Sequence, residues 1–193
     1  ISVAAWVRVD EPLQWGGIVG AAQDNGDFER GWLLGFNDSQ FSFALAGTQG
    51  NGRLTYLKAT KSFTTKRWHH VVGTFNGAEM KVFVDGQLSA SSTTQKGDIH
   101  YPPQAFYEIG AYHDKDEYHR LNGAIHEVRV YDDVLTPAEI AAQYEEKGTM
   151  FPVPKPEFEV AFGPSLQFTG NGTAIIEWKT NEPSLTRLTL KSR

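Results

Sequence analysis

The chain has 193 residues, of which 40% are hydrophobic, 12% aromatic and 21% charged, a balance that is typical of globular domains and excludes a disordered or collagen-like chain. The formal net charge is -5 and no run of Lys or Arg occurs, so we expect neither a nucleic-acid partner nor an anionic membrane surface. Disulfides, thiolate metal sites and cysteine nucleophiles are excluded because the sequence has no cysteine.

Short runs of β-branched and aromatic residues, separated by Gly, Asn, Asp and Pro, predict an all-β sandwich. The sharpest signal lies in residues 80–88, where Asp85 and Gly86 supply the positive φ angles that a tight hairpin needs. We expect strands at about residues 2–9, 17–21, 31–36, 40–47, 53–60, 68–76, 79–85, 87–93, 106–112 and 123–131.

One short helix is expected after Leu135, where it closes the first domain. Thr136 is a suitable N-cap, Pro137 fits the first turn, and Glu139 completes a capping box. Gly148 is the expected stop.

The composition changes after this helix, since proline stands at every second position from Pro152 to Pro156. This spacing favours an extended spacer. We therefore expect a first domain at 1–148, a proline-rich linker at 149–157 and the opening of a second β domain at 158–193. In the second domain, strands are expected at 165–168, 173–179 and 185–190.

Three segments of the first domain resemble the laminin G-like jelly-roll family, whose relatives include the concanavalin A-like lectins and glucanases. They are residues 2–8, residues 68–77 continuing into 82–86, and residues 122–131 followed by Leu135 and Thr136. The resemblance implies a two-sheet antiparallel jelly-roll sandwich. The family usually has one or two strands before the segment at Ser2, which implies that N-terminal strands are missing here.

The tail is similar to a second family. Residues 162–167 and 174–183 resemble the fibronectin type III-like domain that precedes the catalytic domain of purple acid phosphatase-type metallophosphatases. This resemblance implies a larger parent protein with a metallophosphoesterase domain downstream. The metal ligands of such an enzyme are not expected in this chain, because it has no Gly-Asp-x-Gly or Gly-Asn-His-Glu stretch.

No catalytic residue is expected in the chain. Glucanase relatives place carboxylates two residues apart on one strand, so that both enter the same cleft, and no Glu-x-Asp-x-Glu pattern occurs. Glu127 has Arg129 at the next position on the same face, which favours an ion pair. His69 and His70 are neighbours on a predicted strand and point to opposite faces, so packing explains them better than a shared metal.

Two acidic segments are candidate calcium sites. Asp114 and Asp116 lie in residues 113–119, and Asp24 and Asp27 lie in residues 23–31. Carboxylate oxygens are the ligands that calcium prefers. The first segment departs from the usual calcium-loop pattern, and a solvated loop between two strands is the alternative. For the second, an ordinary turn at Asn25 and Gly26 is the alternative.

Trp15 stands beside Gly16 and Gly17 in a predicted loop. An exposed indole there could stack on a sugar ring or anchor a protein partner, and the alternative is a side chain that folds back over the sandwich edge. Asp114 and Asp116 are the other two candidate ligand-binding residues.

These observations predict a non-catalytic binding or adhesion module for a glycan or a protein surface. The module would belong to a larger secreted protein, extracellular or in the cell envelope or periplasm, and its remaining partners would be downstream domains of the same polypeptide. Calcium is the candidate cofactor, and the two histidines of 113–119, His113 and His119, are candidate ligands of a transition metal. A purely structural spacer and a glycoside hydrolase of the concanavalin A-like class are the alternatives.

Overall fold

The computed structural model describes residues 1–103, 107–151, 160–168 and 174–180, the last two ranges as strands alone. The chain forms two compact units, residues 1–152 and 153–193. In the second unit, β13 (Val160–Phe168) pairs antiparallel with β14 (Ala174–Thr180). The strand expected at 185–190 and most of the expected linker lie outside the described residues.

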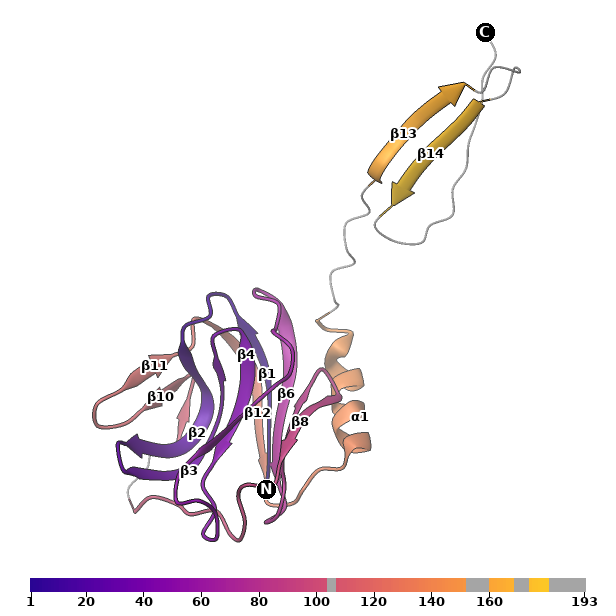
Figure 1. The fold of residues 1–193 in the computed structure, drawn as a ribbon. Helices are drawn as coiled ribbons and strands as arrows, with labels where there is room; N and C mark the ends of the chain where they lie inside the picture. The colour runs from indigo at the N-terminus through magenta and orange to yellow at the C-terminus, as the bar shows by residue number, and fades with distance from the viewer. Residues whose placement is uncertain (104–106, 152–159, 169–173, 181–193) are drawn as a thin grey trace. The chain divides into compact units, whose positions relative to one another are not determined.

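The first unit contains two five-stranded antiparallel sheets (Figure 1). The first sheet has the order β12 (Gly123–Tyr131), β1 (Ser2–Val9), β6 (Trp68–Phe75), β7 (Met80–Val84) and β8 (Gln87–Ser92). The second has the order β5 (Thr55–Lys58), β4 (Gln40–Leu45), β3 (Phe28–Asn37), β2 (Trp15–Asn25) and β9 (Glu108–Ile109). The expected all-β, two-sheet sandwich is confirmed.

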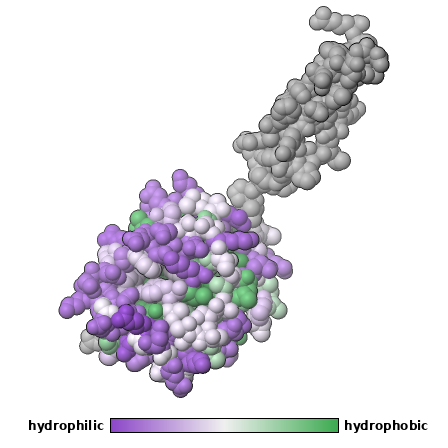
Figure 2. All heavy atoms as spheres, in the orientation of Figure 1, coloured by the Kyte–Doolittle hydropathy of each residue, from purple (hydrophilic) through white to green (hydrophobic). Residues whose placement is uncertain are grey.

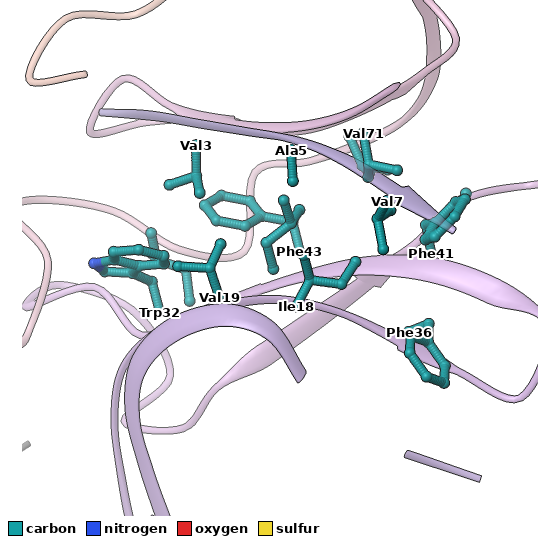
Figure 3. Close-up of a cluster of buried hydrophobic side chains, with 14 of the residues drawn as sticks. Val3, Ala5, Val7, Ile18, Val19, Trp32, Phe36, Phe41, Phe43 and Val71 are labelled. Atoms are coloured by element: carbon teal, nitrogen blue, oxygen red, sulfur yellow. The ribbon is translucent and has the colours of Figure 1, made fainter. Parts of the chain in front are cut away.

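The core lies between the two sheets and follows the period of two that strands impose. Figure 3 shows Val3 and Ala5 of β1 facing Ile18 of β2 and Phe43 of β4 across the gap between the sheets. All four side chains are at most 2% exposed, and Trp32 of β3 is completely buried among them. The face of the first unit that Figure 2 shows carries mostly hydrophilic residues with small apolar patches between them.

The expected hairpin is confirmed, since Asp85 (φ 50°) and Gly86 (φ 78°) form the turn between β7 and β8. The prediction of one continuous strand at 106–112 is wrong, because the chain forms two short strands there. Gly110 has a φ of 83° and turns the chain, so that β9 joins the second sheet while β10 (Ala111–His113) pairs with β11 (Tyr118–Arg120). The separate β10–β11 hairpin was not predicted, because β11 falls in the segment interpreted as a solvated or calcium-binding loop.

The helix α1 (Pro137–Gly148) has the predicted capping box between Thr136 and Glu139. Its position is fixed by Ile140, which is completely buried against Ala4, Val72 and Phe83 on the outer face of the first sheet. The expected stop at Gly148 is wrong by one residue, since Gly148 is the last helical residue and Thr149 is the C-cap. In the part of the chain that the structure describes, no helix has the length and apolar character needed to span a bilayer.

The two neighbouring histidines of β6 lie on opposite faces of the first sheet, as expected. His69 enters the core side, where it contacts the ring of Phe41 and bonds Asp85 at 2.9 Å. His70 lies under α1, where its ring centroid is 5.3 Å from that of Trp6. It is 2% exposed, and this burial lowers its pKa from the ordinary 6.5 to about 4.

The charged side chains beside His70 form a cluster under α1. Glu127 bonds Arg129 at 2.6 Å, which confirms the predicted ion pair, and it also accepts from Lys147 of α1. The cluster thus ties β12 to the helix.

The burial of His70 predicts a stability that falls in mild acid. Between pH 7.5 and 5 the unfolded chain takes up a proton on this residue that the folded chain does not, so acidification favours unfolding, by about 2 kcal/mol. Urea unfolding at a series of pH values measures this slope. His70→Gln should remove most of it, whereas His126→Gln, which changes an exposed residue of the same sheet, should retain it. Equal slopes in the two variants would show that His70 is not the group responsible.

Candidate functional site

The outer face of the second sheet, on the side away from the core, carries a pocket of about 150 Å³. Its floor includes Leu33 of β3 and Ser42 of β4, which alternate with the inward-facing core residues of their strands. Its walls come from the two ends of β2, from β5 and from the β10–β11 hairpin. The side chains that form them are Trp15, Asp24, Tyr56, Tyr112, Glu117 and His119.

The hairpin can lie against this face because β2 has a glycine, Gly17, at the point where β10 crosses it. A Cβ atom on Gly17 would lie 2.2 Å from the carbonyl carbon of Ala111, which is closer than any packed side chain can approach. A Cβ atom on Gly16 would similarly lie 2.0 Å from the ring of Phe36, which lines the pocket. Gly17 is therefore crossed closely by backbone and Gly16 by an aromatic ring. The prediction of a loop around Trp15 is wrong, since Trp15 is the first residue of β2.

A polar network joins β2 to the hairpin. The backbone N–H of Asp24 donates to the hydroxyl of Tyr112 at 2.9 Å and to Oδ2 of Asp114 at 3.2 Å, and the Tyr112 hydroxyl donates to the same carboxylate. On the other side of the pocket, the Tyr56 hydroxyl donates to Oδ2 of Asp24 at 2.7 Å. Asp24 and Asp114 thus meet although 90 residues separate them in the sequence.

The network keeps the carboxylate of Asp114 ionised and the phenols of Tyr56 and Tyr112 protonated. Partial burial acts to raise the pKa of Asp114, but the hydrogen bonds from Tyr112 and from the N–H groups of Asp116, Glu117 and Asp24 outweigh it and lower the pKa. Burial, reinforced by the adjacent carboxylates, raises the pKa of both Tyr56 and Tyr112. Both phenols therefore remain donors at any physiological pH.

Aromatic rings stand on two sides of the pocket. Trp15, which is half-buried, lies against Tyr56 with a centroid separation of 5.3 Å and an interplanar angle of 60°. Across the pocket, His119 stacks on Tyr112 at 6.1 Å with an angle of 13°. Such rings offer rigid apolar faces to a ligand.

The structure brings together part of the predicted site. Trp15 and Asp24 line the pocket, and Asp114 lies behind its wall. Asp116 accepts a hydrogen bond from the side chain of Asn25 at the hairpin tip. Asp27 lies apart, with a fully exposed side chain 3.5 Å from Arg53.

The turn expected at Asn25 and Gly26 is confirmed, since Gly26 (φ 60°) lies in the turn between β2 and β3. Among the residues that the structure describes, no group of three or more Asp, Glu or His side chains is arranged to hold a metal ion. Both oxygens of Asp114 already accept hydrogen bonds. Calcium binding by these residues stays a prediction.

Tyr56, Tyr112, Glu117 and His119 were not predicted as site residues. The sequence carried one usable signal, since Tyr112 and Asp114 stand two positions apart and so share a face if the segment is a strand. The interpretation of this segment as a loop concealed that signal.

A two-sheet sandwich with a pocket on one sheet face, walled by aromatic and carboxylate side chains, defines a lectin-like class of domain. Residues 1–141 match the family model described as the Concanavalin A-like lectin/glucanases superfamily, and the chain belongs to this superfamily.

The chain is also similar to individual proteins. It is 22% identical to pappalysin-1 of Mus musculus over 165 residues, which are 80% of this chain and 10% of that protein, so it spans about a tenth of the length of this curated relative. Among solved structures, it resembles the CBM40 domain of the Ruminococcus gnavus IT-sialidase, bound to α2,3-sialyllactose, with a TM-score of 0.60 and 14% identity over 74% of this chain and 81% of that one. A putative carbohydrate binding protein from Bacteroides ovatus has a TM-score of 0.55 and 22% identity, over 72% of this chain and 39% of that one. At these identities the structural likeness shows the fold.

The network predicts that Tyr112→Phe destabilises the first unit. Loss of the hydroxyl leaves Asp114 without one donor and the Asp24 N–H without one acceptor, at a cost of about 1–3 kcal/mol in the free energy of unfolding. Chemical denaturation measures the change. Tyr118→Phe is the matched control, because it removes the hydroxyl of an exposed tyrosine from the same hairpin, and a loss of equal size there would contradict the assigned role.

Proposed function

We propose that the first unit is a non-catalytic domain that binds a glycan in the pocket on the second sheet. The observation that carries the proposal is the presence of aromatic faces and fixed hydrogen-bonding groups in one pocket. A sugar ring has apolar C–H faces and a rim of hydroxyl groups. Aromatic rings such as Trp15 pack against the former, and the carboxylates of Asp24 and Glu117 accept hydrogen bonds from the latter.

The known proteins with a similar fold support this proposal. The CBM40 domain was solved with a bound sialylated sugar, and the Bacteroides ovatus protein is described as a putative carbohydrate binding protein. Both support a sugar as the ligand class, while the pocket itself indicates which residues of this chain would contact it.

The wider setting is also a proposal. The family supports an extracellular, cell-envelope or periplasmic location, in which the domain would adhere a larger protein to a glycan-bearing surface. The antiparallel pair β13–β14 falls within the tail segments that resemble a fibronectin type III-like domain, and the metallophosphoesterase parent rests on that resemblance alone. The family match ends at residue 141 and does not reach the tail.

A glycoside hydrolase is the second candidate, because Asp24 and Glu117 line the same pocket. Hydrolysis requires one carboxyl group that stays protonated near neutral pH, usually through burial. Glu117 has a side chain that is 46% exposed, and Asp24 already accepts the Tyr56 hydroxyl. These environments suit hydrogen-bond acceptors better than an acid–nucleophile pair. New reducing ends released from a bound oligosaccharide, and lost in Glu117→Gln, would establish the hydrolase instead.

The proposal predicts that Trp15→Ala weakens binding of an oligosaccharide selected on a glycan array by at least about tenfold, because the apolar face against the sugar ring is removed. Titration calorimetry with that oligosaccharide gives the dissociation constants. Leu88→Ala removes an exposed apolar side chain of the first sheet and should leave binding unchanged. If the unmutated chain binds no glycan on the array, the proposal fails and the structural-spacer alternative gains support.

A further inference from the structure

The charged side chains that line the pocket are carboxylates. Two of its lining side chains are carboxylates, Asp24 and Glu117, and no Lys or Arg is among the described residues that line it. The lining group that can become cationic is His119, whose Nε2 lies 3.4 Å from Glu117. When imidazole is neutral, the pocket wall therefore carries negative charge alone.

The negative potential comes from several elements around the pocket. The charges of Asp24, Glu29 and Glu117 all act on Tyr56, where they add to burial in raising the pKa of its hydroxyl. Asp24 belongs to β2, Glu29 to β3, and Glu117 to the turn of the β10–β11 hairpin. A ligand beside Tyr56 would therefore meet the Asp24 and Glu117 carboxylates, which line the pocket, and would lie in the field of the buried Glu29 behind them.

Three cationic side chains near the pocket contact other groups. Lys58 is the register partner of Ser42 on the pocket floor, but its ammonium donates to Oδ1 of Asn37. Arg53 lies 3.5 Å from Asp27 and 3.8 Å from Glu29. The guanidinium of Arg120 lies over the ring of Tyr118, 4.4 Å from its centroid.

We infer that the pocket selects sugars by charge: it accepts uncharged sugar units and excludes units that carry a carboxylate or sulfate group. The inference rests on the proposed function and names the ligand class within it. Its physical basis is that an acidic sugar would bring a further anion to within a few ångströms of the Asp24 and Glu117 carboxylates, which would repel it. Hydroxyl groups, in contrast, donate to those same carboxylates.

A glycan array that holds neutral glycans beside their sialylated and sulfated derivatives tests the inference at pH 8, where imidazole is ordinarily neutral. We expect binding of neutral glycans and a loss of at least about tenfold in affinity for the acidic derivative of each bound glycan. The loss should shrink between 20 mM and 500 mM salt, since screening weakens a charge effect and leaves a steric one unchanged. Tightest binding of an acidic glycan would overturn the inference and leave glycan binding intact, whereas no binding at all would overturn both.

Neutral variants identify the groups responsible. Glu117→Gln, at an exposed position, and Asp24→Asn should each improve the affinity for acidic relative to neutral derivatives by about threefold or more. Asp27→Asn removes a carboxylate outside the pocket and should leave the ratio unchanged, and Lys58→Gln should not weaken binding of acidic derivatives. An unchanged ratio in both pocket variants, or a loss of acidic-glycan binding in Lys58→Gln, would show that the carboxylates do not set the selectivity.

Discussion

The close passage of β10 over β2 is the constraint on which the candidate site depends. Backbone atoms of Ala111 occupy the space that a side chain at Gly17 would need, so the hairpin can lie on the sheet only because that side chain is missing. This passage places Tyr112, Glu117 and His119 opposite Trp15 and turns a flat sheet face into a pocket. The polar network then holds the two parts together, because the partly buried N–H of Asp24 finds its acceptors on the hairpin.

The same aspartates that suggest ligand chemistry are also structural. Asp114 closes the hairpin turn by accepting from the N–H groups of Asp116 and Glu117, while its other oxygen accepts from Tyr112 and Asp24. The side chain of Asp24 accepts a hydrogen bond from the Tyr56 hydroxyl and also lines the pocket, where a ligand can reach it. Acidic side chains at this site therefore divide between those that build the wall and those that face a ligand.

The sequence predicted those features that depend on local patterns. Alternation of apolar residues predicted the bounds of β1 and β12 as they are observed. Asp85 and Gly86 indicated the hairpin between β7 and β8, and Thr136 with Glu139 indicated the start of α1. The pocket could not be predicted in this way. The strand β11 has only three residues, which is too short for a recognisable period, and the approach of β10 to Gly17 brings together residues that are remote in the sequence. The glycines beside Trp15 were visible, but glycine serves loops and close backbone contacts alike.

The outer faces of the two sheets are covered by different elements, and this difference explains the position of the pocket. On the first sheet, α1 covers the outer face: Ile140 is completely buried there, and Lys147 bonds Glu127 of β12. The cavity that remains beneath the helix is about 10 Å³, room for no more than one water molecule. On the second sheet, the cover is a two-stranded hairpin that lies mainly along β2, so the neighbouring floor at Leu33 and Ser42 lines an open pocket. Of the two outer sheet faces, the second sheet therefore offers the larger pocket to the proposed ligand, and aromatic rings and negative charge meet there.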